Sequence, residues 1–292
     1  MTINGGTIRA GLRVTIFLLM VALAFPVFYL SRRLLSEENR TIVNRTLYKA
    51  VTALIGVKLR VYGAPVNNRP CLYVSNHLSY LDIPVLGSLL KSSFVSRADV
   101  QGWPLFGVLG KLQRTIWIDR KPELAVAHAK ELRNRIEAGD RILVFPEGTS
   151  TDGLRLLPFK STLFEVAAPF KNADGTETHV TVQPISIIVT EMGNLPIGRH
   201  QRPLYSWYGD MTFDKHFIDM LHLAGFTMEV QFHAPVTMAQ FGNRKKLAAH
   251  CEKVVAEGVS AGLAGRLGEH ANPSDMTGMM ADKPIQLLEG QS

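Results

Sequence analysis

The sequence contains very little cysteine. Its 292 residues include only Cys71 and Cys251, which lie far apart and have no histidine at the spacing of a metal site. This excludes a disulfide framework and gives no indication of bound zinc. So few cysteines without a disulfide pattern are typical of a protein in the reducing cytosol, where we expect the main domain to lie.

The sequence also lacks a stripe of basic residues interleaved with aromatic ones. Its 32 lysines and arginines exceed its 25 acidic residues and give a net charge of +7, but they are dispersed along the chain. We therefore expect no nucleic-acid partner. A positive balance of this kind suits an acidic membrane leaflet or a phosphate-bearing carrier.

Charged residues are absent from Val14 to Ser31. This apolar stretch has about the minimum length of a membrane-spanning helix, and no small-residue cleavage signal of a secretory peptide follows it. Basic residues are more frequent after it, which places the following chain in the cytoplasm by the positive-inside rule. Residues 1–36 are thus predicted to anchor the protein to the inner membrane. A buried core helix is the alternative, and Pro26 leaves open whether the helix spans the bilayer or lies in one leaflet.

Residues 37–264 are predicted to form one α/β domain. Short runs of strand character alternate with helical patterns, which is typical of a mixed, largely parallel sheet flanked by helices. The strand-like runs are 57–63, 71–75, 93–96, 115–118, 141–145, 180–189, 203–209 and 226–236, and the helical patterns are 38–56, 122–138 and 243–259. The first of these helices has a basic side, so it either lies on a membrane surface or packs on its own domain. Residues 265–292 are expected to be a flexible tail.

The strand-like run at 71–75 ends just before Asn76-His77, and Asp82 follows five residues after the histidine. A histidine at a strand exit can act as a general base near neutral pH, and a nearby aspartate can orient its ring and stabilise the imidazolium. A His-Asp pair at some spacing also occurs by chance in many chains, where histidine is a structural hydrogen-bonding residue. The pair predicts acyl transfer only if other parts of the chain support it.

Three further strand-like runs carry polar residues or proline. Arg120 follows the run at 115–118, and Glu147, Gly148 and Thr149 follow the run at 141–145. Since ligands collect beyond the carboxyl ends of strands in open α/β sheets, His77, Arg120 and Glu147 are predicted to converge on one cleft. Pro184, inside the run at 180–189, implies an edge or bulge position.

In these stretches the chain resembles the glycerolipid acyltransferases, a family that includes bacterial 1-acylglycerol-3-phosphate acyltransferases. The resemblance rests on four boxes in order, which are Asn76-His77 through Asp82, Ile118-Asp119-Arg120, Phe145 through Thr149, and Val182 through Ile185. It implies that His77 is the catalytic base and Asp82 its orienting partner. It also implies that Arg120, Glu147, Gly148 and Thr149 form the acceptor site.

The same resemblance implies the reaction partners. The donor is expected to be a thioester of acyl carrier protein or of CoA, the acceptor a lysolipid in the membrane, and the chemistry needs no metal or cofactor. His77 would remove a proton from the lysolipid hydroxyl while that oxygen attacks the thioester carbonyl.

One position departs from the phosphatidate-forming members, where an arginine often follows the threonine of the third box. Here that residue is Ser150. The sequence from Ser150 to Gly153, with Leu157 to Ser161 and Trp207 to Asp210, looks like the branch that acylates lyso-ornithine lipid. Loss of a fixed cation removes about 1.5–3 kcal/mol of charge-assisted hydrogen bonding to a phosphate. Lyso-ornithine lipid is therefore the preferred acceptor and lysophosphatidate the alternative. The ornithine ammonium needs a carboxylate partner, which Asp152 or Glu147 could supply. Asp152 is equally well explained as an ordinary turn residue before Gly153.

Other classes of protein are weighed against this interpretation. A serine lipase or thioesterase needs a nucleophile, and Ser260 lies in a G-x-S-x-G sequence, but a helical stretch leads into it where a nucleophile elbow requires a strand. Cys71 is expected to be a core residue. A non-catalytic lipid-binding protein has no need of the His77–Asp82 pair.

Overall fold

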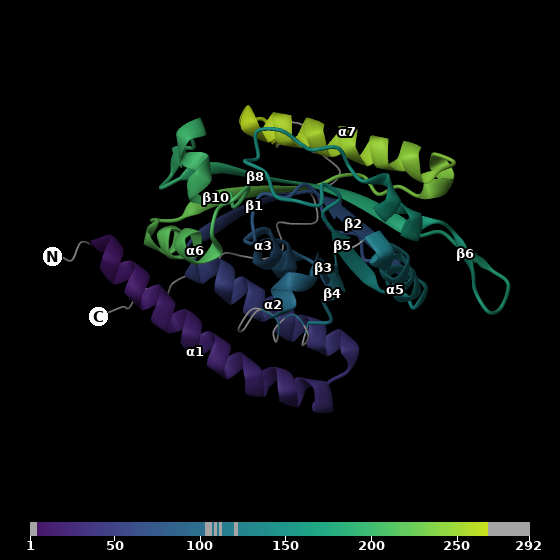
Figure 1. Cartoon of the computed structure of the whole chain (residues 1–292), viewed down its shortest axis with the longest axis horizontal. Helices are drawn as coiled ribbons and strands as arrows, with labels where there is room; N and C mark the ends of the chain where they lie inside the picture. Colours follow the sequence, from purple (N-terminus) through teal and green to yellow (C-terminus); the bar gives the residue numbers. More distant parts are fainter. Residues whose placement is uncertain (1–4, 103–106, 108–109, 111–112, 120–121, 268–292) are drawn as a thin grey trace, which may run out of the picture.

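A mixed sheet forms the centre of the protein (Figure 1). The structure is a computed structural model that describes residues 5–102, 107, 110, 113–119 and 122–267. The strands run in the order β1-β10-β8-β2-β5-β3-β4, and β9 pairs with β8. From β8 to β4 all neighbours are parallel, whereas β1 and β10 run antiparallel to them. The predicted fold class is confirmed. The strands are β1 (Val57–Tyr62), β2 (Cys71–Ser75), β3 (Ser93–Arg97), β4 (Ile116–Ile118), β5 (Arg141–Val144), β8 (Thr181–Met192), β9 (Leu195–Pro196) and β10 (Phe226–Phe232).

Helices cover both faces of the sheet. One face packs against α2 (Glu37–Leu54), α3 (Asp82–Leu89) and α6 (Phe213–His222). The other packs against α5 (Ala125–Glu137) and α7 (Arg244–Leu263). A small hairpin, β6 (Phe170–Lys171) and β7 (Glu177–Thr178), projects beyond the sheet (Figure 1). The short 3-10 helices are η1 (Ala98–Gly102), η2 (Pro122–Leu124), η3 (Ser161–Ala167), η4 (Arg199–Leu204) and η5 (Met238–Gln240).

Strand β2 shows why the sheet is buried on both sides. Cys71 and Tyr73 pack with α2, α3 and α6, whereas Leu72 and Val74 pack with α5 and α7. Successive side chains of a strand point to opposite faces, so a strand between two helical layers needs an apolar residue at every position. The continuous apolar run of β2 thus places the chain that follows it at the carboxyl edge of the sheet.

The strand expected at 203–209 is absent, and this part of the prediction is wrong. The segment forms the end of η4 and a loop, in which Tyr205 and Ser206 donate their backbone N–H groups to the carbonyl of Arg202. Turn hydrogen bonds of this kind satisfy the backbone locally. Of the aromatic residues that suggested a strand, Trp207 contacts Tyr80 in the loop between His77 and Asp82, and Tyr205 contacts Phe226 of β10.

Pro184 lies in an interior strand, so its prediction as an edge residue is wrong, but the alternative of a bulge fits. Ile185 pairs with Phe232 and Val182 with Val236, so two residues of β8 face three residues of the neighbouring chain. The carbonyl of Pro184 still accepts the N–H of His233 at 3.0 Å. The missing N–H of the proline falls where the ladder with β10 is already interrupted.

Helix α1 (Gly5–Leu34) runs through Pro26 along the outside of the domain, next to α2 and α6 (Figure 1). Only 22% of its most apolar 18-residue stretch is buried, which is not the pattern of a core helix. Arg9 donates to the carbonyl of His222 at 2.9 Å, and Arg13 donates to the carbonyls of Leu221 and Leu223 at 3.0 and 2.7 Å. The first half of α1 is thus attached to the carboxyl end of α6.

Candidate active site

The candidate site lies where β2 and β5 end. These strands are parallel neighbours, so the residues that follow them meet at one edge of the sheet. His77 comes two residues after the end of β2, and Phe145, Pro146 and Glu147 follow β5 directly. The first and third boxes of the sequence therefore form one site, as the sequence predicted.

Asn76 anchors the chain as it leaves β2. Its side chain is 3% exposed, and its amide donates to the carbonyl of Ile187 and accepts the N–H of the same residue, both at 2.9 Å. The side chain thereby imitates one further residue of a β-ladder to β8. This fixes the direction in which the next residue, His77, leaves the sheet.

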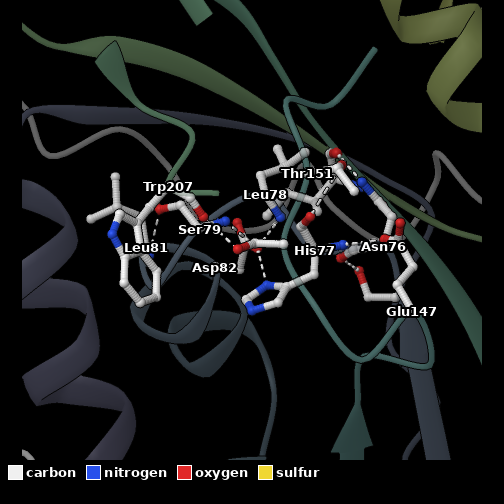
Figure 2. A network of polar contacts seen from close by, with 12 residues as sticks. Asn76, His77, Leu78, Ser79, Leu81, Asp82, Glu147, Thr151 and Trp207 are labelled. Carbon is white, nitrogen blue, oxygen red and sulfur yellow. Dashed lines mark hydrogen bonds and ion pairs between the residues drawn. The ribbon is translucent and has the colours of Figure 1, made fainter. Parts of the chain in front are cut away.

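Asp82 holds the His77 ring (Figure 2). Its Oδ2 lies 2.7 Å from Nδ1 of His77 and also accepts the N–H groups of Leu78 at 2.6 Å and Ser79 at 3.0 Å. Asp82 is fully buried and is the first residue of α3, where the helix dipole stabilises a carboxylate. Because the carboxylate accepts both amides, the histidine must donate from Nδ1. Its Nε2 is then the nitrogen that can take a proton.

The ring of His77 is held from a second side by Phe145. The two rings stack with centroids 4.0 Å apart and an angle of 14° between their planes. The His77 side chain nevertheless remains 21% exposed, whereas Asp82 is 0% exposed. The imidazole therefore reaches the surface while the carboxylate that orients it does not, which is the arrangement that a general base requires.

Glu147 joins the two loops through backbone amides. Oε1 accepts the N–H of His77 and Oε2 accepts the N–H of Leu157, both at 2.8 Å, and the residue is only 4% exposed. Burial raises the pKa of this carboxyl from 4.5 to about 7. These contacts favour a positioning role, and the predicted role in acceptor binding stays a prediction. Sequence reasoning did not foresee that the Glu147 side chain would accept a hydrogen bond from the backbone of His77.

Gly148 and Thr149 are exposed at the turn after Glu147. Gly148 has a φ of +73°, in the left-handed region that favours glycine, and a Cβ at this position would lie 2.3 Å from Nζ of the flexible Lys160 side chain. The exposed Lys160 thus places an ammonium group beside the predicted acceptor site, a proximity that the sequence did not indicate. Ser150, which stands in the position of the family's arginine, donates its hydroxyl to the carbonyl of Trp207.

Arg120 lies outside the described residues, so its role in acceptor binding stays a prediction. Strand β4, which ends at Ile118, is the outermost strand beyond β3. Asp119, which precedes Arg120, donates its backbone N–H to Nε2 of His128 at 3.0 Å. Among the residues described here, no group of three or more His, Cys, Asp or Glu side chains lies together as a metal site would require.

The alternative nucleophiles are not placed for catalysis. Ser260 lies within α7, and Gly258 of the same G-x-S-x-G sequence packs against Ser186 and His233. A nucleophile elbow needs a sharp turn from strand to helix, which a position inside a helix cannot supply. Cys71 is 0% exposed, and burial raises the pKa of its thiol to about 12, so it is a core residue as expected.

Glu147→Gln tests the buried carboxyl. Between about pH 4.5 and 7 the unfolded carboxyl ionises before the folded one, so the wild type loses stability as pH rises. The uncharged glutamine does not titrate. We therefore expect the free energy of unfolding of the wild type to fall, relative to the variant, by about 2–3 kcal/mol over this range. Chemical denaturation at a series of pH values measures the difference.

The exposed Glu257→Gln is the matched control, because it makes the same chemical change at a solvated position of α7. A difference for Glu147→Gln that is independent of pH, or that favours the wild type as pH rises, would contradict the raised pKa.

Comparison with known proteins identifies the family. A family profile described as Acyltransferase matches residues 58–188. The lyso-ornithine lipid O-acyltransferase of Brucella abortus is 36% identical over 263 residues, which cover 89% of this chain and 97% of that protein. The 1-acyl-sn-glycerol-3-phosphate acyltransferase of Neisseria meningitidis is 31% identical over 134 residues, covering 45% of this chain and 51% of that protein.

The crystal structure of the 1-acyl-sn-glycerophosphate acyltransferase PlsC from Thermotoga maritima has the same fold. Its TM-score is 0.63 at 18% identity, and the match covers 87% of this chain and 94% of that one. The resemblance stated from the four boxes is confirmed by a relative that matches along nearly its whole length. The chain belongs to the acyltransferase family whose members O-acylate lysolipids.

Proposed function

We propose that this enzyme transfers a fatty acyl group from a thioester to the hydroxyl of lyso-ornithine lipid, with His77 as general base. The observation that carries the proposal is the partly exposed His77 ring, whose Nδ1 is held 2.7 Å from the buried Asp82 carboxylate. This contact leaves Nε2 to accept the proton of an alcohol. Histidine in this arrangement is the common general base of acyl transfer.

In the proposed reaction, Nε2 of His77 removes the hydroxyl proton of the lysolipid as its oxygen forms a bond to the thioester carbonyl carbon. Asp82 stabilises the imidazolium that results. The tetrahedral intermediate then collapses, the C–S bond breaks, and the thiolate leaves with both electrons. The imidazolium returns the proton to the thiolate or to solvent, so the products are the acylated lipid and a free thiol. A thiolate needs little help from a general acid.

The acceptor is proposed from two observations. The relative that matches 89% of this chain bears the name lyso-ornithine lipid O-acyltransferase, whereas the glycerol phosphate enzyme of Neisseria matches only 45%. Ser150 uses its hydroxyl to bond Trp207, where an arginine would present a cation to a phosphate. Lysophosphatidate remains the second candidate, because Lys160 places a different ammonium group beside Gly148.

The donor is proposed to be acyl carrier protein or CoA. Either one presents its acyl chain as a thioester on a carrier that bears phosphate, and the net charge of +7 suits such a partner. We further propose that residues 37–264 form the acyltransferase domain, that residues 1–36 anchor it, and that residues 265–292 are a C-terminal tail, which lies almost entirely outside the described residues.

The anchor is proposed to lie in the cytoplasmic leaflet of the inner membrane. Arg9 and Arg13 bond to carbonyls at the end of α6, and Phe17 contacts Phe217 of the same helix at a centroid distance of 5.6 Å. The other end of α1 leads directly into α2 (Figure 1). Both ends of α1 thus lie beside the domain, which suits a helix that rests in one leaflet with its exposed leucines in lipid. The basic residues after the apolar stretch favour the cytoplasmic side.

His77→Ala is expected to lower kcat by about 10²–10⁴-fold, because the proton of the attacking alcohol then has no acceptor. The fold should persist, since Asp82 keeps its two backbone amides and the ring is partly exposed. Steady-state kinetics with the purified protein, together with its unfolding midpoint, measure both effects. A folded His77→Ala enzyme with activity close to the wild type would refute the assignment of the base.

A side-by-side assay tests the acceptor. Purified enzyme is given lyso-ornithine lipid or lysophosphatidic acid, each with acyl-ACP and with acyl-CoA, and the products are identified by mass spectrometry. We expect a higher kcat/KM for lyso-ornithine lipid, because Ser150 offers a phosphate no fixed charge. Product formed from lysophosphatidic acid alone would overturn the proposed acceptor and leave the family assignment intact.

Cysteine labelling tests the position of α1. Gly5→Cys and Asn39→Cys introduce exposed thiols before and after the apolar stretch, while the native Cys71 and Cys251 are 0% exposed. We expect an impermeant maleimide to label both variants in inside-out vesicles and neither in intact spheroplasts. Labelling of the two positions from opposite sides of the membrane would show that α1 spans it.

A further inference from the structure

A segment outside the four boxes lies against the catalytic loops. It consists of η4 and the loop up to α6. Three hydrogen bonds connect this segment and the two loops that follow β2 and β5. Trp207 donates its N–H to the carbonyl of Leu78 at 3.0 Å, and Thr151 donates its N–H to the carbonyl of His77 at 3.0 Å. Ser150 donates its hydroxyl to the carbonyl of Trp207. Figure 2 shows Trp207, Leu78 and Thr151 gathered around the His77–Asp82 pair.

Arg202 in this segment is a buried cation without an anion. The residue is 7% exposed, and Nη1 donates to the hydroxyl of Tyr205 at 2.9 Å. Nε is buried and has no acceptor in the described part of the chain, and no carboxylate among those residues lies within 4.0 Å of the guanidinium. A buried arginine is usually paired, because an uncompensated buried charge strongly destabilises the folded protein. The unpaired Arg202 therefore points to an anionic group that comes from a ligand.

Asp152 supplies the opposite charge nearby. Its Oδ1 accepts the N–H of Leu154 at 3.0 Å, and the residue is only partly buried. Both Arg202 and Asp152 act on the pKa of the Tyr205 hydroxyl, in opposite directions, although burial dominates and raises that pKa to about 12. The Arg202 guanidinium and the Asp152 carboxylate thus both influence the Tyr205 hydroxyl, but they do not form an ion pair with each other.

Gly153 connects this pair to the catalytic loop. Its φ is +71°, and a Cβ would lie 2.7 Å from Cδ2 of Leu78 and 3.7 Å from Nη1 of Arg202. The guanidinium is therefore close to the residue that directly follows His77. A group bound at Arg202 and Asp152 would belong to a molecule that also reaches the base.

We infer that Arg202 and Asp152 recognise the zwitterionic head group of the acceptor, with the guanidinium binding its carboxylate and Asp152 its ammonium. The inference rests on the proposed function. An ornithine whose α-amino group carries the fatty chain keeps one carboxylate and one ammonium group, which match this pair of charges. It also accounts for Ser150 in place of the family's arginine, because Arg202 of η4 supplies the cation. The continuation of the third box supplies the acid, Asp152.

The test uses full-length Arg202→Gln and Asp152→Asn, with Arg199→Gln and Asp214→Asn as matched controls on exposed residues of η4 and α6. We expect each test variant to raise KM for lyso-ornithine lipid by about 10–100-fold while kcat changes less, since a charged hydrogen bond to the substrate is lost. The controls should keep the wild-type KM. Arg202→Lys retains the charge and covers the case in which the glutamine variant does not fold, and it should raise KM less than the removal of Asp152 does.

A second measurement separates this inference from the proposed function. Nα-acetyl-ornithine, a soluble head-group probe, is titrated into wild type and variants and followed by ligand-observed NMR. Binding to the wild type and to the controls, but not to Arg202→Gln or Asp152→Asn, supports the inference even if the enzyme does not turn over lyso-ornithine lipid, an outcome that overturns only the proposed acceptor. Turnover of lyso-ornithine lipid with unchanged KM in both test variants, or equal probe binding by all proteins, overturns the inference and leaves the proposed function in place.

Discussion

The geometry of the site depends on one carboxylate oxygen. Oδ2 of Asp82 accepts hydrogen bonds from Nδ1 of His77 and from the backbone N–H groups of Leu78 and Ser79, so it shapes the loop and orients the imidazole ring at the same time. Three donors on a fully buried acceptor leave the ring few other orientations. The conformation of this loop therefore depends mainly on the buried aspartate at the start of α3, where the helix dipole also favours the negative charge.

The adjacency of β2 and β5 explains why two distant boxes act as one site. Parallel neighbours deliver their following residues to the same edge, and there Glu147 reaches the N–H of His77 while Thr151 reaches its carbonyl. Both backbone groups of His77 are thus held by the loop after β5. Asn76 adds a third attachment, to β8 on the other side of β2. His77 is thus fixed by the segments beside it in the sheet, which lie about 70 and 110 residues away in the sequence.

Much of this could be predicted from the sequence, because strands buried on both faces read as apolar runs and their exits carry the polar residues. The His77–Asp82 contact followed from the boxes. The role of Glu147 did not, because a carboxylate that bonds to backbone amides leaves no pattern in the sequence. The segment 203–209 was misjudged, since aromatic side chains that pack on a loop resemble those of a strand. For Pro184 the sequence leaves an edge and a bulge open, because an interruption in the neighbouring ladder is invisible in one sequence. Arg202 belongs to no box, and its burial becomes evident only in three dimensions.

The aromatic contacts of Tyr80 have a consequence for how the enzyme meets its lipid. Tyr80 lies in the His77–Asp82 loop, and its ring centroid is 6.2 Å from that of Phe217 in α6. The ring centroids of Phe217 and of Phe17 in α1 are 5.6 Å apart. Two ring contacts thus separate the reacting loop from the helix proposed to lie in the leaflet. With α1 in the leaflet, a lysolipid can offer its hydroxyl to His77 while its acyl chain remains among the surrounding lipids. In that case the turnover rate would follow the mole fraction of lysolipid in the bilayer plane, and diluting the vesicles at constant composition would leave it unchanged for enzyme already bound.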